Sequence, residues 1–323
     1  MRAARAQPRI DLLTVGEAFQ DLIFVGLPHL PKSGEELRTG AFTATIGGGA
    51  VITATAAARL GLRTAIVSAL SADAAASLRR DTVRVVNVKR RSEAHAVSVS
   101  LSTRHDRSFV TFNGVNDRLE ARLPAPIARQ RARHVHLAFA PRSCARWIRI
   151  VDGLRRRGVT TSWDFGWNPP LREAPGFGAL IRSADFVFVN EAEAALYARQ
   201  RRGAAAFAFW RHAARNTIVK LGPRGSRWIT GRWAGEGDVA RRLQPNVARR
   251  IQPSEFSAPA PRVRVVDTTG AGDAFNGGFL VAFLDGRSPR ECLRLGNTTG
   301  ARSTRAAGGL DALPTRRTRP TRP

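Results

Sequence analysis

Short runs of apolar, mostly β-branched residues recur along the chain, and longer stretches with helical periodicity separate them. Each run has the length of a buried strand and is followed by polar or glycine-rich residues. The pattern predicts strands at residues 10–15, 64–70, 134–139, 160–163, 186–189 and 217–221. It predicts helices at residues 51–60, 74–80, 143–157, 171–183, 191–200 and 204–214. This alternation indicates an α/β fold in which helices cover both faces of a mainly parallel sheet.

Three regions depart from this rhythm. Residues 21–45 and 83–113 alternate apolar and polar positions, which is typical of an antiparallel sheet with one exposed face, such as a small β lid over a site. Residues 231–261 are rich in Gly, Pro and Arg without any period, and we expect an irregular insertion there. We expect residues 1–9 to be flexible and the basic tail 315–323 to be disordered, so that one domain spans residues 10–314.

Length and composition narrow the class of protein. A chain of 323 residues with 43% hydrophobic residues can bury the core of one large α/β domain or of two small ones. The two cysteines cannot form a disulfide framework, and no apolar run approaches the roughly 20 residues of a membrane span. Since residues 1–10 also lack the apolar segment of a secretory signal, we expect a cytoplasmic protein without a membrane partner.

The net charge of +27 raises the question of nucleic-acid binding. Only three of the 52 basic residues are lysines, and the arginines are spread along the chain rather than gathered in one arm. No reader motif and no interleaving of aromatic and basic residues accompanies them. We interpret the excess as a compositional bias towards arginine and alanine, and we expect no nucleic-acid partner.

The stretch from Val265 to Leu280 carries the most chemical information. A β-branched run leads into a small-residue turn that contains Gly270 and Gly272, and a helix with an apolar face follows. Amides at a helix N-terminus favour an anion, and the glycines let the backbone approach it closely. Asp273 in the same turn could cap the helix or act as a base that takes a proton from a hydroxyl. Because strand, turn and helix fit together over the whole stretch, we favour a site for phosphoryl transfer.

At this point the sequence resembles the ribokinase-like (PfkB) family of carbohydrate kinases. Residues 267–275 (DTTGAGDAF) look like the C-terminal signature of that family, and residues 47–54 (GGGAVITA) look like its N-terminal signature. Residues 190–193 (NEAE) match its Asn-Glu-x-Glu motif, and residues 220–226 (KLGPRGS) are similar to its turn near the nucleotide. The four motifs occur in the order of the family.

The resemblance implies a three-layer αβα sandwich with a small β lid, and it implies phosphoryl transfer from ATP to a hydroxyl of a sugar-like acceptor. It also implies Mg²⁺ as a cofactor, leaves K⁺ as an additional candidate, and suggests a homodimer because lid strands in this fold often pair between subunits. Carried over by position, the catalytic groups would be the base Asp273 and an anion hole formed by Gly270, Ala271 and Gly272. The nucleotide would lie near Asn190, Lys220, Gly222, Gly225 and Asn297. The acceptor would bind Asp21, Gly47 and Gly48, Mg²⁺ would be near Glu193, and the monovalent cation would be near Asp267 and Thr269.

Several of these residues have a simpler structural interpretation. Asp21 could cap a turn, Glu193 lies at a helix start where acidic residues are favoured in any case, and Asn297 could be an ordinary helix residue. Lys220 could be a solvated strand end.

The sequence departs from the family pattern at three places. Many members have an Asn where this chain has Ile52, and an apolar side chain cannot form a hydrogen bond to an acceptor hydroxyl there. The segment 71–83 is short, and the insertion 231–261 lies near the expected nucleotide side. These departures leave two alternatives to a sugar kinase: a nucleoside kinase, in which a flat base packs near Ile52, and a non-catalytic relative that senses a sugar or nucleotide. The intact Asp273 argues against the second.

Overall fold

The computed structural model describes residues 10–103, 107–231 and 255–316. The expected flexible N-terminus, the end of the basic tail from residue 317 and most of the expected insertion (232–254) lie outside the described residues. No helix in the described ranges has both the length and the apolar character needed to cross a membrane.

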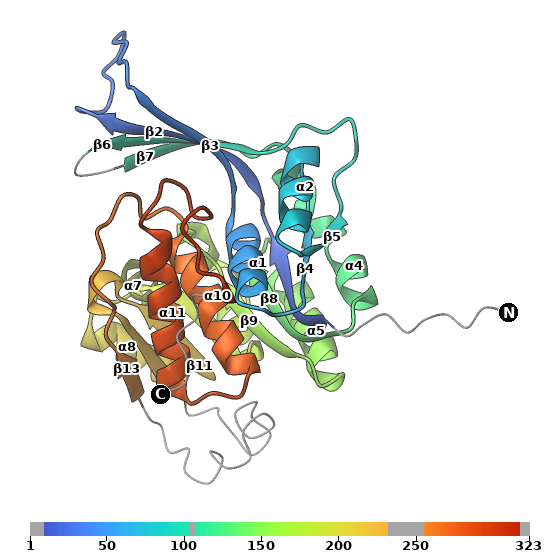
Figure 1. Cartoon of the computed structure of the whole chain (residues 1–323). Coiled ribbons are helices and arrows are strands. Elements are labelled where there is room, and N and C mark those ends of the chain that lie inside the picture. The colour runs from blue at the N-terminus through green and yellow to red at the C-terminus, as the bar shows by residue number, and fades with distance from the viewer. Residues whose placement is uncertain (1–9, 104–106, 232–254, 317–323) are drawn as a thin grey trace, which may run out of the picture.

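A large sheet forms the centre of the molecule (Figure 1). Its strands are β1 Ile10–Gly16, β4 Thr64–Ser68, β5 Arg84–Asn87, β8 Ala132–Ala138, β9 Thr160–Asp164, β10 Phe186–Asn190, β11 Asn216–Lys220, β12 Ser226–Thr230 and β13 Glu255–Ala258. They are ordered β13-β12-β11-β10-β9-β8-β1-β4-β5. The pairs from β11 to β5 are parallel, whereas β12 and β13 are antiparallel additions at one edge. The predicted mainly parallel sheet is confirmed.

Helices cover both faces of this sheet, which gives the predicted three layers. One face carries α1 Gly49–Arg59, α2 Ala72–Arg80, α10 Ala271–Leu284 and α11 Pro289–Ser303. The other face carries α4 Pro124–Arg129, α5 Cys144–Arg156, α6 Phe177–Ser183, α7 Glu191–Ala198 and α8 Ala204–Ala213. Between α1 and α11, the buried helix α10 lies very close to both neighbours. A Cβ on Gly277 would lie 2.7 Å from the Ala56 methyl group, and one on Gly278 would lie 2.3 Å from Thr299 Oγ1, so only glycine permits this packing.

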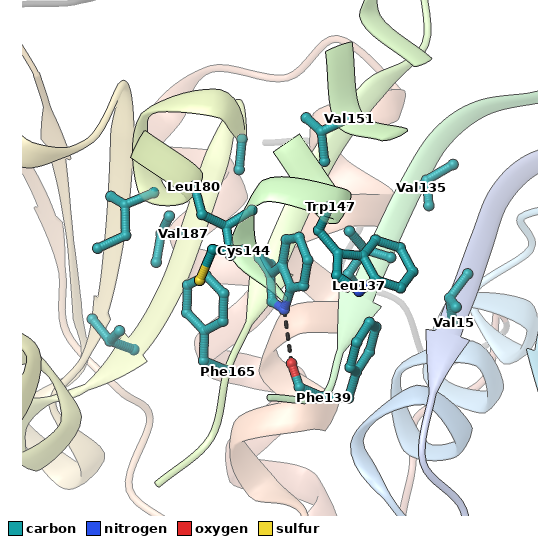
Figure 2. Packing of buried hydrophobic residues seen from close by; sticks show 14 of the residues in the cluster. Val15, Val135, Leu137, Phe139, Cys144, Trp147, Val151, Phe165, Leu180 and Val187 are labelled. Atoms are coloured by element: carbon teal, nitrogen blue, oxygen red, sulfur yellow. Dashed lines mark hydrogen bonds between the residues drawn. The ribbon is translucent and has the colours of Figure 1, made fainter. Parts of the chain in front are cut away.

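The core beneath α5 and α6 is rich in aromatic rings (Figure 2). Trp147 from α5 packs edge-on against Phe139, which follows β8, with ring centroids 4.9 Å apart. The carbonyl of Phe139 accepts a hydrogen bond from Trp163 Nε1 at 2.8 Å. These contacts hold the segment after β8 next to the end of β9, and both segments lead into the site described below.

A second, smaller sheet projects from the body (Figure 1) and comprises β2 Phe19–Leu27, β3 Ala41–Gly47, β6 Val97–Thr103 and β7 Arg107–Phe112 in the order β3-β2-β6-β7. Its two outer pairs are antiparallel as expected, but β2 and β6 run parallel because the chain visits the large sheet between them. The small second sheet is confirmed, but the antiparallel arrangement that the alternation predicted is wrong for the central pair of β2 and β6.

Other boundaries also differ from the predictions. The start of the segment 83–113, expected in the lid, is β5 at the edge of the large sheet. β13 pairs with β12 within the segment 231–261 that was expected to be irregular. The helix expected at 171–183 is a 3₁₀ turn, Pro169–Glu173, followed by α6, because Pro175 and Gly176 interrupt it.

Candidate active site

Polar side chains gather where the parallel strands end. Asp164 ends β9, Asn190 ends β10 and Lys220 ends β11. Because neighbouring parallel strands end at the same edge of a sheet, the fold brings these three residues together although they are far apart in the sequence. The crevice outside the carboxyl ends of such strands is the usual ligand position in open α/β sheets.

Asp273 lies in the first turn of α10, at the same edge of the sheet. A Cβ on Gly49 would be 3.0 Å from Asp273 Oδ1, and Thr53 Oγ1 donates to the Asp273 carbonyl at 3.1 Å. The glycine-rich motif at 47–49 and the motif at 267–275 therefore meet around this carboxylate. Gly270, the N-cap of α10, has φ +71° and packs against Ile52, so a side chain would be strained and would clash there.

The amides at the start of α10 are arranged for an anion, with one exception. Ala271 N donates to the Thr268 carbonyl at 3.2 Å, so that amide is already engaged. In the described part of the chain, the amides of Gly272 and Asp273 have no acceptor, as is normal for the first turn of a helix. A helix of 14 residues adds its dipole to these two donors.

A buried ion pair between Lys220 and Asp164 lies next to the first turn of α10. Lys220 Nζ lies 2.7 Å from Asp164 Oδ2, and the same oxygen accepts from Asn276 Nδ2 at 2.8 Å. Lys220 Nζ is also 3.2 Å from where a Cβ of Gly272 would be. Lys220 is thus an interior residue of the site, not a solvated strand end.

Asp164 and Asn276 are site residues that sequence reasoning missed. The signal for Asp164 was present, because it directly follows the predicted strand 160–163 and the carboxyl ends of parallel strands carry ligand sites. Asn276 gave no comparable signal, since its hydrogen bond to Asp164 spans 112 positions in the sequence.

Asn190 and Glu193 form a reciprocal capping box at the start of α7. Asn190 Oδ1 accepts from Glu193 N at 2.9 Å, and Glu193 Oε2 accepts from Asn190 N at 2.8 Å. The structural interpretation of this pair therefore holds. It does not exclude a role at the site, because the charges of Asp164 and Lys220 act on the Glu193 carboxyl.

At the base of the lid, Asp21 lies on β2 against Gly47, where a Cβ would come within 1.8 Å of Asp21 Oδ2. Gly48, with φ +100°, is the N-cap of α1.

The Asp267 carboxylate accepts from Thr269 N at 2.9 Å and from Gly308 N at 2.9 Å. Asp267 and Thr269 therefore shape the loop before α10, and the negative charge of Asp267 acts on Asp21.

The remaining candidate residues for the nucleotide are Gly222, Gly225 and Asn297. Gly222 and Gly225, with φ +60° and +94°, form the tight turn that follows Lys220 and leads into β12. Asn297 is buried on α11, and its Nδ2 donates to the carbonyls of Ala258 and Pro259 at 2.9 and 3.2 Å, so the interpretation as a structural helix residue holds.

Ile52 is 2% exposed and packs under Gly270 and Gly309. It is not among the residues that line the pocket beside Asp273, so at this position the side chain belongs to the core, and the nucleoside-kinase alternative stays a prediction.

A pocket of about 820 Å³ opens beside Asp273. Gly49, Ala138 and Asp164 also line it, so it adjoins both glycine-rich motifs and the ends of β8 and β9. Its remaining walls come from Glu17 and from residues 113, 116, 117, 119, 120, 139–142, 165–168, 170, 171 and 174. In the described ranges, no group of three or more His, Cys, Asp and Glu residues is arranged to hold a metal ion by itself.

Burial raises the pKa of Asp273 to about 7, and the neighbouring Asp164 charge adds to this effect while Lys220 opposes it. Burial likewise raises the pKa of Asp21 and of Glu193 to about 7. A carboxyl group with a pKa near neutrality is suited to general base catalysis.

These pKa values predict opposite pH dependences of activity and stability. In the role of a general base only the ionised form of Asp273 would accept a proton, so the kcat/KM of a reaction that depends on it should rise with pH and level off above about 7. A carboxyl whose pKa is raised in the folded state binds more protons there than in the unfolded chain, so its contribution to stability falls between about pH 4 and 7. The variant Asp273→Asn cannot ionise, and its free energy of unfolding relative to the natural protein should therefore increase from pH 5 to pH 8.

Urea denaturation and the pH profile of kcat/KM measure these two effects. In the control Asp21→Asn, activity should be lower but the rise near pH 7 should remain. A profile without this rise would remove Asp273 from the role of base.

Comparisons with known proteins bear on the activity of this site. A model of the family described as pfkB family carbohydrate kinase matches residues 9–316. A ribokinase from Arabidopsis thaliana is 26% identical over 326 residues, which cover 95% of this chain and 79% of the relative.

Solved structures share the fold. The adenosine kinase from Sinorhizobium meliloti has a TM-score of 0.77 at 21% identity and covers 96% of this chain and 98% of its own. The Arabidopsis thaliana ribokinase complexed with ribose and ATP has a TM-score of 0.70 at 24% identity and covers 96% and 97%.

Proposed function

Since the chain belongs to the pfkB family of carbohydrate kinases, we propose that it transfers the γ-phosphoryl group of ATP to a hydroxyl of a sugar or sugar-like acceptor. The observation that carries the proposal is the position of Asp273. Its carboxylate lies at the pocket, next to Gly49 and in the same first turn of α10 as the amides of Gly272 and Asp273. The ribokinase complexed with ribose and ATP supports ATP as the donor.

In this proposal Asp273 takes the proton from the acceptor hydroxyl as its oxygen bonds to the γ-phosphorus, and the bond to the β-phosphate oxygen breaks to release ADP. The amides of Gly272 and Asp273 and the ammonium of Lys220 stabilise charge on the transferred group. Positioning and charge stabilisation of this kind account for most of the catalysis in phosphoryl transfer.

The charges at the site fit a divalent cation. The carboxylates of Asp164, Glu193 and Asp273 all act on the Lys220 ammonium, so within this group of four described residues the negative charges outnumber the positive charge. Mg²⁺ would be held near Glu193, through its waters and beside Asn190, and would neutralise phosphate oxygens. A monovalent cation near Asp267 and Thr269 remains a prediction.

A panel of acceptors tests the proposed function. The purified protein is incubated with MgATP and K⁺ and with pentoses, hexoses, sugar phosphates, nucleosides and disaccharides, and the release of ADP is measured. We expect turnover with at least one hydroxyl acceptor. ATP binding without turnover on any acceptor would instead favour the non-catalytic, sensing relative.

We further propose a homodimer in which the lid sheets of two copies pack together. The face of the small sheet that points away from the site presents Leu22, Phe24, Phe42, Ala44, Val97, Val99, Leu101, Val110 and Phe112, which the strand register places on one side. Phe42, Val110 and Phe112 are 55%, 67% and 57% exposed. An apolar sheet face of this extent is typical of a surface that another chain covers.

Changing Val110 to Asp should convert this dimer to a monomer, because a carboxylate buried in an apolar interface would be left without a partner. Sedimentation velocity on the full chain measures the outcome. The control is Thr111→Asp, on the same strand but on the opposite face, where Thr111 contacts Ser98. A natural protein that sediments as a monomer would contradict the proposal.

A further inference from the structure

The pocket beside Asp273 is larger than a single sugar ring requires. Pockets of roughly 300–1,000 Å³ hold drug-sized ligands, and this one, at about 820 Å³, lies in the upper part of that range. It continues from Asp273 and Gly49 to Trp167 and Asn168, which follow β9. Trp167 is three positions beyond Asp164, so their Cα atoms are at most about 11 Å apart. An acceptor whose hydroxyl lies at Asp273 would therefore leave room for a second group near Trp167.

Trp167 differs from the other tryptophans of the described residues. Its exposed fraction is 61%, whereas those of Trp147, Trp163, Trp210 and Trp228 are 5% or less. A large apolar ring that is left open to solvent inside a ligand pocket is available to pack against a ligand.

The backbone around Trp167 is held rigidly. Gly166 N donates to Asp164 Oδ1 at 3.1 Å, and the Gly166 carbonyl accepts from Tyr197 Oη at 2.5 Å. On the other side, Asn168 Oδ1 accepts from Leu171 N at 3.0 Å and caps the following 3₁₀ turn. The ring is therefore presented by a fixed turn that is also bonded to Asp164, and a ligand that packs on it would lose little energy in ordering the protein.

The charges in the pocket restrict the acceptor further. Glu17, Asp117 and Glu120 line it together with Asp164 and Asp273, and the basic side chain among its lining residues is Arg142. Arg142 lies 3.6 Å from Asp117, and Glu120 accepts from Trp147 Nε1 at 2.7 Å. Burial raises the pKa of Glu17, the charge of Asp117 adds to this rise, and the charge of Arg142 opposes it. Within a chain of net charge +27, this wall is locally acidic and disfavours anionic ligands.

We propose that the acceptor is a two-ring compound without negative charge, in which the ring that is phosphorylated lies at Asp273 and the second ring packs on Trp167. The second ring is either a nucleobase or another sugar, because both present a flat or apolar face to an indole. This inference rests on the proposed kinase function and makes Trp167 a residue that determines its specificity.

Kinetics with matched acceptors test the inference. The one-ring acceptors are ribose, fructose and glucose; the two-ring acceptors are adenosine, cytidine, maltose and sucrose; the anionic acceptors are ribose 5-phosphate and gluconate. We expect the natural protein to have its highest kcat/KM on a two-ring acceptor and none on the anionic ones. Nucleosides and disaccharides distinguish the two sources of the second ring.

Three variants assign the preference to the indole. In Trp167→Ala the ratio of kcat/KM on two-ring to one-ring acceptors should fall about tenfold, mainly through KM. In Trp167→Phe most of the ratio should be kept. The control Arg172→Ala changes the same segment but does not line this pocket, and the ratio should stay constant.

Binding can be measured independently of turnover. The preferred two-ring acceptor should protect the accessible tryptophan fluorescence from acrylamide quenching in the natural protein, and this protection should be lost in Trp167→Phe. Efficient turnover of one-ring acceptors only, turnover of an anionic acceptor, or a ratio that Trp167→Ala does not change would overturn the inference and leave the kinase function intact. The absence of turnover on every acceptor would overturn both.

Discussion

Replacing Asp273 by Asn should lower kcat by about 10²–10⁴-fold, because the variant loses the group that takes the proton from the acceptor hydroxyl. The amide keeps the size of the carboxyl group and leaves the backbone of α10 unchanged. The KM for ATP should therefore change little, since the amides of Gly272 and of residue 273 remain at the helix N-terminus. Coupled measurement of ADP release with the preferred acceptor gives both constants.

The matched control for this variant is Asp285→Asn. Asp285 follows α10 at its C-terminus, at the other end of the same helix from the pocket. Activity close to that of the natural protein is expected, because this change removes the same charge far from the reacting groups. If Asp273→Asn kept more than a tenth of the natural kcat, another group would have to be the base.

The sequence predicted the layers of the fold because each layer depends on local patterns. The strands from 10–15 to 217–221 are short, apolar and β-branched, and each begins or ends within about two residues of its predicted position in the structure. The parallel centre of the lid could not be predicted in the same way. Strands β2 and β6 are separated by β3, β4 and β5, so their direction depends on where the chain re-enters the small sheet.

In the candidate site, too, local motifs could be predicted from the sequence, whereas contacts between distant segments could not. The motifs at 47–54 and 267–275 could be recognised because glycines at a helix N-terminus have a local function. The ion pair of Lys220 and Asp164 joins two strand ends that are 56 positions apart, and only the order of strands in the sheet brings them together. Ile52 illustrates the opposite case, in which a position assigned to the acceptor by resemblance is filled by a residue of the core beneath Gly270.

Removal of the Lys220 ammonium should destabilise the folded protein as well as the reaction. Asp164 is 8% exposed, and in Lys220→Met its buried carboxylate would keep, among the described residues, Asn276 and the Gly166 amide as hydrogen-bond partners. Breaking a buried ion pair on one side costs about 3–5 kcal/mol. We therefore expect the free energy of unfolding of Lys220→Met to fall by about that amount, as measured by urea denaturation.

The double variant Lys220→Met/Asp164→Asn separates stability from catalysis. It removes both charges, so most of the lost stability should return, because no unpaired charge remains buried. Its kcat should stay about 10²–10³-fold low, since the ammonium that stabilises charge on the transferred phosphoryl group is still missing. The control Lys89→Met removes a lysine whose Nζ donates to the neighbouring Arg90 carbonyl at the surface, and it should change the free energy of unfolding by less than about 0.5 kcal/mol. Recovery of activity together with stability in the double variant would mean that Lys220 acts only by neutralising Asp164.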